Sequence, residues 1–512
     1  MFDSMAPAAP PTGPTLDSVA RFSAWFLQRH PRTTPESAAL VDRICASARA
    51  ENRAAAAQLV AIGELFALRL SHCGETQEWA VDTEAAVAAE VAAALRISQG
   101  LAGSRLCYAR AMRERLPQVA EVFKAGDIGL RLFQTIVYRT DLITDGQVLA
   151  TVDAALALAV PRWPSLTASR LAGKIDKIVA KADRDAVRRR KERQGEREIG
   201  FQDQQGGLSE IYGHMFTVDA RALDKALDAL AATVCEHDPR SREQRRADAM
   251  GALTARADRL GCRCGRADCP VGSRPGASLV VIHVIAEQAT VDGTGDKPGW
   301  LVEADGLVPP ELIAELAASA RLVALVHPGD APPEARYVPS KALAAFVRCR
   351  DLTCRWPGCD VPAIKCDIDH TIPYTDGGPT HASNLKCYCR THHLAKTFWG
   401  WQEKQLPDGT LILAAPSGQI YVTMPGSALL FPSLCAPTGD LAPPEPQPDD
   451  RCAERSAMMP RRRRTRAQNR AARINTERNQ NRRAREARLA ARSAAMFPKV
   501  APGGAEDDPP PF

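Results

Sequence analysis

The sequence predicts an α+β protein with three parts. These are a mainly α N-terminal domain with a few strands, a small zinc-stabilised module and a basic C-terminal tail. Apolar residues recur at helical spacing through much of residues 16–180, which is typical of amphipathic helices. Two Cys/His pairs enclose residues 354–392, a segment too short to build a core alone. We therefore expect a disordered start (1–15), a mostly helical domain of unknown role (16–330), a metal-stabilised domain (335–430), and a Pro-rich linker with a disordered Arg-rich tail (436–512).

Helices are expected throughout the N-terminal half of the chain, with strands following later. The expected helices are residues 38–70, 83–97, 104–116 and 130–143. The last two could be mistaken for a DNA-reading helix-turn-helix, but packed helical hairpins are the commoner outcome. Further along, we expect strands at 211–218 and 278–285, and helices at 219–234 and 309–320.

Composition places the protein in a broad class. Hydrophobic residues make up 45% of the chain and aromatic residues only 5%, which predicts cores rich in Ala, Leu and Val. No uninterrupted run of 18 apolar residues occurs and the start has no charged-then-apolar signal, so we expect a cytoplasmic protein without a membrane partner. Fifteen cysteines, about half in short clusters, fit a reducing compartment better than a disulfide framework. The sequence has no Gly-rich phosphate loop, so ATP-driven chemistry is not indicated.

The positive charge of the chain is concentrated near its C-terminus. Residues 461–492 contain 13 Arg and 2 Glu, a local net charge of +11, which leaves −5 for the rest of a chain of net charge +6. This segment has few large apolar residues and cannot bury a core. We expect a nucleic-acid arm that folds on a phosphate backbone. The alternative is a solvated extension without a dedicated ligand.

Four residues have the spacing of a structural zinc site: Cys354-x4-Cys359 and Cys389-x2-His392. The Pro-Gly pair between the first two thiols favours a tight turn. Residues three apart on a helix share one face, so the second pair can bind the same ion. A closed site of three thiolates and one imidazole leaves no open position for substrate, so we expect structural Zn2+ here. The alternative is a set of reduced thiols that bind nothing.

Other thiols complicate this assignment. Cys366 and Cys387 lie within the same segment and could compete for the ion. A separate run, GCRCGRADCP, contains Cys262, Cys264 and Cys269. Three thiols in eight residues could form a second zinc site with a distant fourth ligand such as Cys235 or His237, or an unliganded thiol-rich loop.

Between the two zinc pairs lie residue types suited to metal-dependent hydrolysis. Asp369 is a hard oxygen ligand for Mg2+ or Mn2+, and the neighbouring His370 suits a general base. Asn384 follows in a loop, where its amide could orient the base or touch the metal. Adjacent helical residues point about 100° apart, so His393 can face a second metal while its neighbour faces the zinc. Spacing alone also allows the two histidines to exchange these roles. Lys396 lies on the same helical face as His393 and is well placed to meet a phosphate.

This ordered set resembles the HNH endonuclease family, also called the ββα-metal nucleases. It is similar in particular to the HNH domain at the end of actinobacterial proteins whose N-terminal half is a mostly helical domain of unknown function. The lead-in at 337–351, Trp401 and an expected hairpin around 407–409 also match that group. One departure is the second zinc pair, Cys-x2-His where many relatives have Cys-x2-Cys, although imidazole is an ordinary zinc ligand.

The resemblance implies specific roles for the matching residues. His370 would be the general base, and Asp369 and His393 would hold a catalytic divalent ion, Mg2+ or Mn2+ and possibly Ni2+ or Zn2+. Asn384 would orient the base or join the metal shell. The residues expected to contact nucleic acid are Lys396, Arg348 and Arg350.

The expected function is therefore hydrolysis of DNA phosphodiester bonds. One alternative is a protein that binds DNA through the zinc-stabilised HNH fold without cutting it. Another treats the helical half as an interaction scaffold with a protein partner that decides where the nuclease acts.

Overall fold

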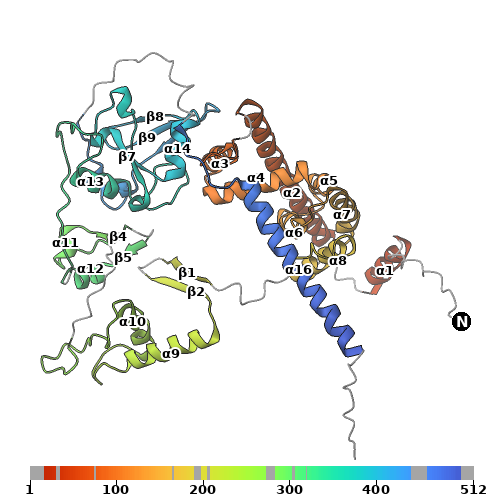
Figure 1. Cartoon of the computed structure of the whole chain (residues 1–512), viewed down its shortest axis with the longest axis horizontal. Coiled ribbons are helices and arrows are strands. Elements are labelled where there is room, and N and C mark those ends of the chain that lie inside the picture. The colour runs from red at the N-terminus through yellow and green to blue at the C-terminus, as the bar shows by residue number, and fades with distance from the viewer. Residues whose placement is uncertain are drawn as a thin grey trace, which may run out of the picture. The chain divides into compact units, whose positions relative to one another are not determined.

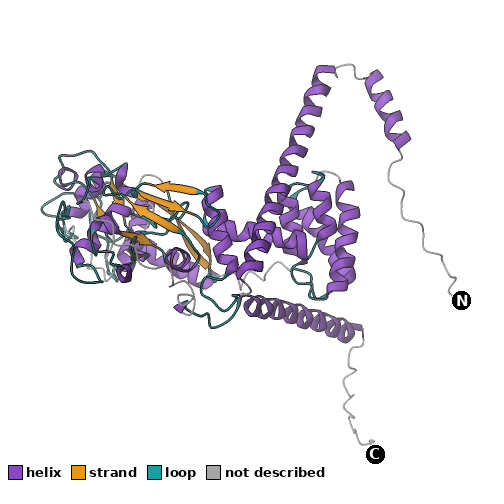
Figure 2. Cartoon of the chain, turned by 90° about the horizontal axis from the view of Figure 1, so that it is seen from above, coloured by secondary structure: helices purple, strands orange, loops and turns teal. Residues whose placement is uncertain are grey.

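The computed structural model of the chain is drawn in Figure 1 and, coloured by secondary structure, in Figure 2. It forms two compact units: the first comprises Met1–Glu64 and Cys107–Val187, and the second comprises Leu65–Leu106 and Arg188–Phe512. Each unit is therefore built from two separated stretches of chain. The expected disordered start, residues 1–15, and most of the Pro-rich linker lie outside the described residues. The structure describes 16–29, 35–73, 76–163, 166–188, 198–204, 208–272, 283–302, 306–318, 320–439 and 458–496.

The described part of the first unit is helical, as the sequence predicts. Its core includes Phe123 and Phe133, whose rings stack with centroids 5.0 Å apart. Asp153 accepts hydrogen bonds from two backbone N–H groups at the start of α5, at 2.8 and 3.0 Å, and so supplies a cap that the apolar Leu116 cannot. The helices are α1 (Leu16–Arg29), α2 (Pro35–Cys73), α4 (Gln99–Glu114), α5 (Pro117–Lys124), α6 (Leu130–Thr140), α7 (Gly146–Ala159) and α8 (Ala168–Ala182); α2 and α4 extend into the second unit.

Among the described helices, α2 alone is long and apolar enough by itself to cross a membrane. Helices α3 (Thr83–Leu95) and α4 pass the same test only as a pair, bent by 111°. Core helices of soluble proteins also pass this test. The expectation of a protein without a membrane partner therefore stays a prediction.

The second unit contains several small elements before its C-terminal module. An antiparallel hairpin joins β1 (Glu198–Asp203) to β2 (Ser209–His214), and a second antiparallel sheet has the strand order β3-β4-β5. The expected strand at 278–285 is described only as β3, because residues 273–282 lie outside the described ranges. The remaining elements are α9 (Thr217–Ala231), α10 (Arg242–Thr254), β3 (Val284–Ile285), α11 (Gln288–Val291), β4 (Gly299–Leu301), β5 (Gly306–Val308) and α12 (Pro310–Ala317).

The C-terminal module is built around an antiparallel hairpin. Strand β6 (Asp367–His370) pairs with β7 (Leu385–Tyr388), and α14 (Arg390–Phe398) follows directly. The core of this module includes Trp356 and Phe346 and also Ala89 of α3. Helix α3 thus packs on the module although it lies more than 250 residues earlier in the chain. The other elements are α13 (Lys341–Asp351) and the three-stranded sheet of β8 (Gln402–Gln405), β9 (Leu411–Ala414) and β10 (Ile420–Thr423).

The expectation of a disordered Arg-rich tail is wrong for part of the tail. Helix α16 (Arg466–Met496) extends over 31 residues, coloured blue in Figure 1. Ala, Arg and Gln all have high helix propensity, so a segment can be helical without an apolar face. Arg466 Nε donates to Asp82 Oδ2 at 2.6 Å, and Arg188 pairs with Glu477 at 2.8 Å, which holds this helix within the second unit.

Candidate functional site

The hairpin and α14 together place the residues expected to hold a catalytic metal. Asp367 and Asp369 are two apart in β6, so their side chains project from the same face of the strand. His393 and Lys396 are three apart in α14 and share a face of that helix. The distances below show that these two faces meet.

Asp369 and His393 lie close enough together to hold one metal ion. Asp369 Oδ1 lies 3.3 Å from His393 Nε2. Two ligand atoms at right angles around Mg2+ or Mn2+, each about 2.1 Å from it, would be roughly 3.0 Å apart. The other ring nitrogen, Nδ1, lies 2.9 Å from Asp367 Oδ2. A carboxylate in this position fixes the orientation of a metal-ligating imidazole. Asp367 was not among the site residues expected from the sequence.

A buried charge network surrounds Asp369. Lys386 Nζ donates to Asp369 Oδ2 at 2.8 Å and pairs with Glu403 at 2.5 Å. Lys396 Nζ lies 3.2 Å from the same Asp369 oxygen and 3.3 Å from Glu403. Burial would raise the pKa of Asp369, but the charges of the two lysines and the contact with His393 lower it below its usual value. Asp369 is therefore a carboxylate at neutral pH.

Burial disfavours the charged form of both histidines, but neighbouring charges shift their pKa values in opposite directions. Burial would lower the pKa of His393, but Asp369 and Asp367 together raise it above its usual 6.5. Burial lowers the pKa of His370 to about 4, and the positive charges of Lys386 and Lys396 act in the same direction. His370 is therefore neutral at physiological pH, as a general base must be before it accepts a proton.

The ring of His370 is held by residues from outside the hairpin. Its Nε2 lies 2.9 Å from Thr380 Oγ1, and Tyr337 stacks on the ring with centroids 5.3 Å apart. Within the described chain no hydrogen bond is recorded for Nδ1 of His370. The structure does not bring this ring into hydrogen-bonding contact with Asp369; its backbone carbonyl accepts a 2.6 Å hydrogen bond from Lys396.

Asn384 does not contact His370 or Asp369 through any recorded hydrogen bond, contrary to the expectation that it orients the base or joins the metal shell. Its Oδ1 accepts from the backbone N–H of Ile372 at 2.8 Å, and its Nδ2 donates to the carbonyls of Ile372 and Pro379. Gly378 in the same loop packs so closely on the Ile372 carbonyl that a Cβ would overlap it. Asn384 therefore fixes the loop that follows His370.

The four residues of the expected zinc site converge. The ligand atoms of Cys354, Cys359, Cys389 and His392 all lie within 4.8 Å of one another, so they could hold a structural metal such as zinc. His392 Nδ1 lies 3.2 Å from Cys389 Sγ. His393 instead faces Asp367 and Asp369. The two histidines therefore lie at different sites, with His392 in the group that could bind zinc, as the resemblance implied. Gln99 Oε1 of α4 lies 3.4 Å from the other ring nitrogen of His392.

The two thiols expected to compete for this ion lie outside the group. Cys366 Sγ is 3.4 Å from the carbonyl of Pro362, and Cys387 is fully buried with its Sγ 4.0 Å from the carbonyl of Val347. The quartet therefore contains the four residues that spacing predicted.

The expected nucleic-acid contact of Arg350 is wrong. Its guanidinium is buried and donates to Asp351 at 2.8 Å and to the carbonyls of Ala382 and Leu385 at 2.8 and 2.7 Å. Arg350 therefore ties α13 to the start of β7. Arg348 is half-buried, and Lys396 has the contacts with Asp369 and Glu403 described above.

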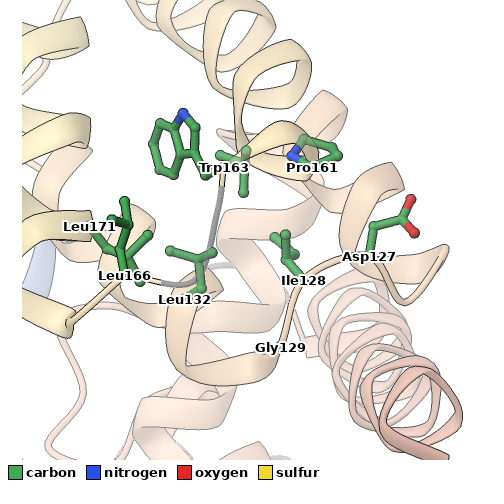
Figure 3. Close-up of a pocket in the computed structure, with 9 residues that line it drawn as sticks. Asp127, Ile128, Gly129, Leu132, Pro161, Trp163, Leu166 and Leu171 are labelled. Carbon is green, nitrogen blue, oxygen red and sulfur yellow. The ribbon is translucent and has the colours of Figure 1, made fainter. Parts of the chain in front are cut away.

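A separate pocket lies in the first unit and offers little chemistry. It has a volume of about 360 Å3 and is lined by Ile128, Leu132, Trp163 and Leu171 (Figure 3). Asp127 at its edge pairs with Arg49. We assign no function to it.

The fold and these sites define an α+β protein with a C-terminal module that could bind metal. The chain matches the family described as a domain of unknown function (DUF222) over residues 46–351, more than half of its length, and therefore belongs to that family. The matched segment ends at Asp351, before the residues that could bind metal, so any proposal for those residues rests on their own geometry. No solved structure matches the chain.

The relatives described below are named as uncharacterized proteins. The uncharacterized protein Rv3776 of Mycobacterium tuberculosis is 44% identical over 470 residues, which cover 86% of this chain and 90% of the relative. The uncharacterized protein Rv2100 of the same organism is 44% identical over 488 residues, covering 86% and 88%. A more distant relative, the uncharacterized protein MT1160, is 25% identical over 296 residues, covering 54% and 68%.

Proposed function

We propose that the protein is a metal-dependent endonuclease of the HNH, or ββα-metal, class that hydrolyses DNA phosphodiester bonds. The observation that supports this most directly is the pairing of Asp369 and His393 across a hairpin and helix, 3.3 Å apart, with Asp367 on the other ring nitrogen. A closed structural zinc site beside it would hold the hairpin and α14 in register.

The proposed mechanism uses one base and one divalent ion. A bound Mg2+ or Mn2+ would supply Lewis-acid stabilisation of the charge that develops on the phosphodiester. Asp369 and His393 would hold this ion, and Asp367 keeps His393 oriented. His370, neutral because burial lowers its pKa to about 4, takes a proton from the attacking water. Its Nδ1 is the nitrogen suited to this, since Nε2 is engaged by Thr380.

We further propose that α16 contributes to DNA binding. Most of its arginines are exposed, and arginine side chains bind phosphates through their fixed fork of donors. The proposed interaction with phosphates is independent of base sequence, so α16 would add affinity without selecting a target site.

A second candidate function is binding of DNA without cleavage. Asp369 Oδ2 already contacts two ammonium groups, of Lys386 and Lys396, which leaves only Oδ1 for an ion. If these contacts persist, the site holds a metal too weakly for chemistry. A protein partner for the helical unit is a further proposal, and association assays with the full-length chain would test it.

The deciding experiment is cleavage of supercoiled plasmid by the purified full-length protein with Mg2+, Mn2+ or Ni2+. We expect nicking or linearisation that requires the metal and is lost in His370→Ala. His72→Ala is the matched control, because His72 is an exposed histidine of α2 outside the module. Folding and zinc content are compared for all three proteins. DNA binding without cleavage at any metal concentration would favour the non-cleaving alternative.

A further inference from the structure

Four cysteines converge at a second place in the second unit, apart from the site proposed above. The sulfurs of Cys235, Cys262, Cys264 and Cys269 all lie within 4.8 Å of one another. Cys235 Sγ and Cys262 Sγ are 3.4 Å apart. Four thiolates around a tetrahedral Zn2+, each about 2.3 Å from it, are roughly 3.8 Å from one another. The four sulfurs are therefore spaced as the ligands of one ion would be.

Local backbone geometry brings these thiols together. Cys235 follows the end of α9, and the other three lie in the loop after α10. That loop turns at Gly265 and Gly272, whose φ angles are +69° and +73°, a conformation that glycine adopts without strain. The N–H of Cys262 donates to the carbonyl of Gly272 at 2.9 Å and closes the loop.

The apolar core of the surrounding segment is small. The buried apolar side chains described in α9, α10 and the loop after them are small in number: Leu230, Ala231, Ala249, Leu260 and Cys262. Polar contacts join the same two stretches, since Arg240 donates to the carbonyl of Gly261 at 2.7 Å and Asp238 accepts from the N–H of Arg263. A metal ion would supply the cross-link that so small a core cannot.

We propose that Cys235, Cys262, Cys264 and Cys269 bind a second structural Zn2+ that fastens the end of α9 to the loop after α10. A set of four cysteine ligands leaves no open position, so this ion has no catalytic role. His237, the alternative fourth ligand from sequence, is not part of the group. Three of these four cysteines are partly exposed, whereas three ligands of the zinc site in the C-terminal module are buried. The second ion is therefore released to a chelator before the first.

Zinc content of the full-length chain, purified under reducing conditions, tests this proposal independently of any nuclease activity. We expect two zinc ions per chain, and one in Cys264→Ser. Cys359→Ser should also retain one, whereas Cys107→Ser, an exposed cysteine of α4, should retain two. One zinc per chain in the wild type, unchanged by Cys264→Ser, would overturn the proposal.

A second measurement covers the case in which Cys264→Ser fails to fold. Alkylation of the intact wild-type chain, read by peptide mass, should spare the four cysteines until a chelator is added, while Cys107 reacts at once. Alkylation of all four at the rate of Cys107, or a disulfide between Cys235 and Cys262 in place of zinc, would also overturn the proposal. Graded addition of chelator should expose these four before Cys354, Cys359 and Cys389.

Discussion

Asp367 Oδ2 lies 2.9 Å from His393 Nδ1, on the side of the imidazole opposite Asp369. The two aspartates are thus alternate residues of one strand that hold the two nitrogens of one ring. Asp369 Oδ1 faces the other ring nitrogen, Nε2, at 3.3 Å. If Asp369 and His393 hold a metal ion, as proposed, binding of that ion would depend on Asp367 as well.

Replacing Asp367 by alanine should weaken metal binding at the proposed catalytic site by about 10–100-fold, because the imidazole loses the partner that orients it. Titration of the zinc-loaded protein with Mn2+ measures this without any cleavage assay. Asp360→Ala is the matched control, since Asp360 is an exposed aspartate of the same module. Equal Mn2+ affinity in both variants would show that Asp367 has no such role.

Arg350→Met should destabilise the C-terminal module by about 3–5 kcal/mol, because it leaves the fully buried Asp351 with one fewer cationic partner. Chemical denaturation followed by tryptophan fluorescence reports the change, since Trp356 and Trp401 lie in the core of this module. Arg336→Ala, at an exposed arginine, should have little effect. A stable Arg350→Met protein with weakened DNA binding would restore the sequence-based prediction that Arg350 contacts nucleic acid.

Stability of the same module should fall as the pH is lowered below about 6.5, in part because of His381. Its Nε2 donates to the carbonyl of Ala331 and its Nδ1 accepts from the N–H of Ser383, so the folded state holds it neutral. Burial lowers the pKa of His381 below 6.5. The unfolded chain therefore binds a proton at a higher pH than the folded chain does. The contribution is fully present above pH 6.5 and is lost as the pH falls through the lowered pKa.

The His381→Gln variant isolates this contribution. Between pH 7 and pH 5, its free energy of unfolding should depend less steeply on pH than that of the wild type. Protonation of His370 and of the zinc ligands affects both proteins, so the difference between their slopes reports His381. Parallel curves would show that His381 keeps an ordinary pKa.

Removal of residues 458–512 should weaken DNA binding and reduce its salt dependence, if α16 binds phosphates. The slope of log K against log salt should become shallower by about 0.9 for every phosphate that α16 neutralises in the wild type. Binding to a labelled duplex at several salt concentrations measures this slope. Deletion of residues 497–512 alone, which removes no arginine, is the control. An unchanged slope in the longer deletion would assign α16 a purely structural role.

Local patterns predicted the sites better than the contacts that support them. Spacing alone identified the four residues that could hold zinc. The 100° step of a helix predicted that His392 and His393 face different sites, and the resemblance to HNH nucleases favoured His392 as the zinc ligand. Gln99 could not be found in this way, because it reaches His392 across 293 residues of sequence. Glu403 was missed for a similar reason: it comes from β8, and nothing near the motif marks it as the partner of Lys386.

The errors have a physical cause as well. Arg350 lies beside the motif, and its charge suggested a contact with a phosphate. In the structure its guanidinium donates hydrogen bonds to the backbone carbonyls of Ala382 and Leu385 instead. The tail was expected to be disordered because it lacks apolar residues. Its high helix propensity and its ion pairs with Asp82 and Arg188 make part of it an ordered helix instead.

The buried set of Asp369, Glu403, Lys386 and Lys396 has two negative and two positive charges. These four groups alone therefore present no net charge to a phosphate backbone, and a divalent ion bound beside them would add two positive charges. Affinity for DNA at this site and affinity for the ion would then be linked, and by thermodynamic reciprocity each would strengthen the other by the same factor. Such an enzyme would bind its catalytic ion fully only when DNA is also bound. A site able to cleave DNA would then exist for little time without a substrate.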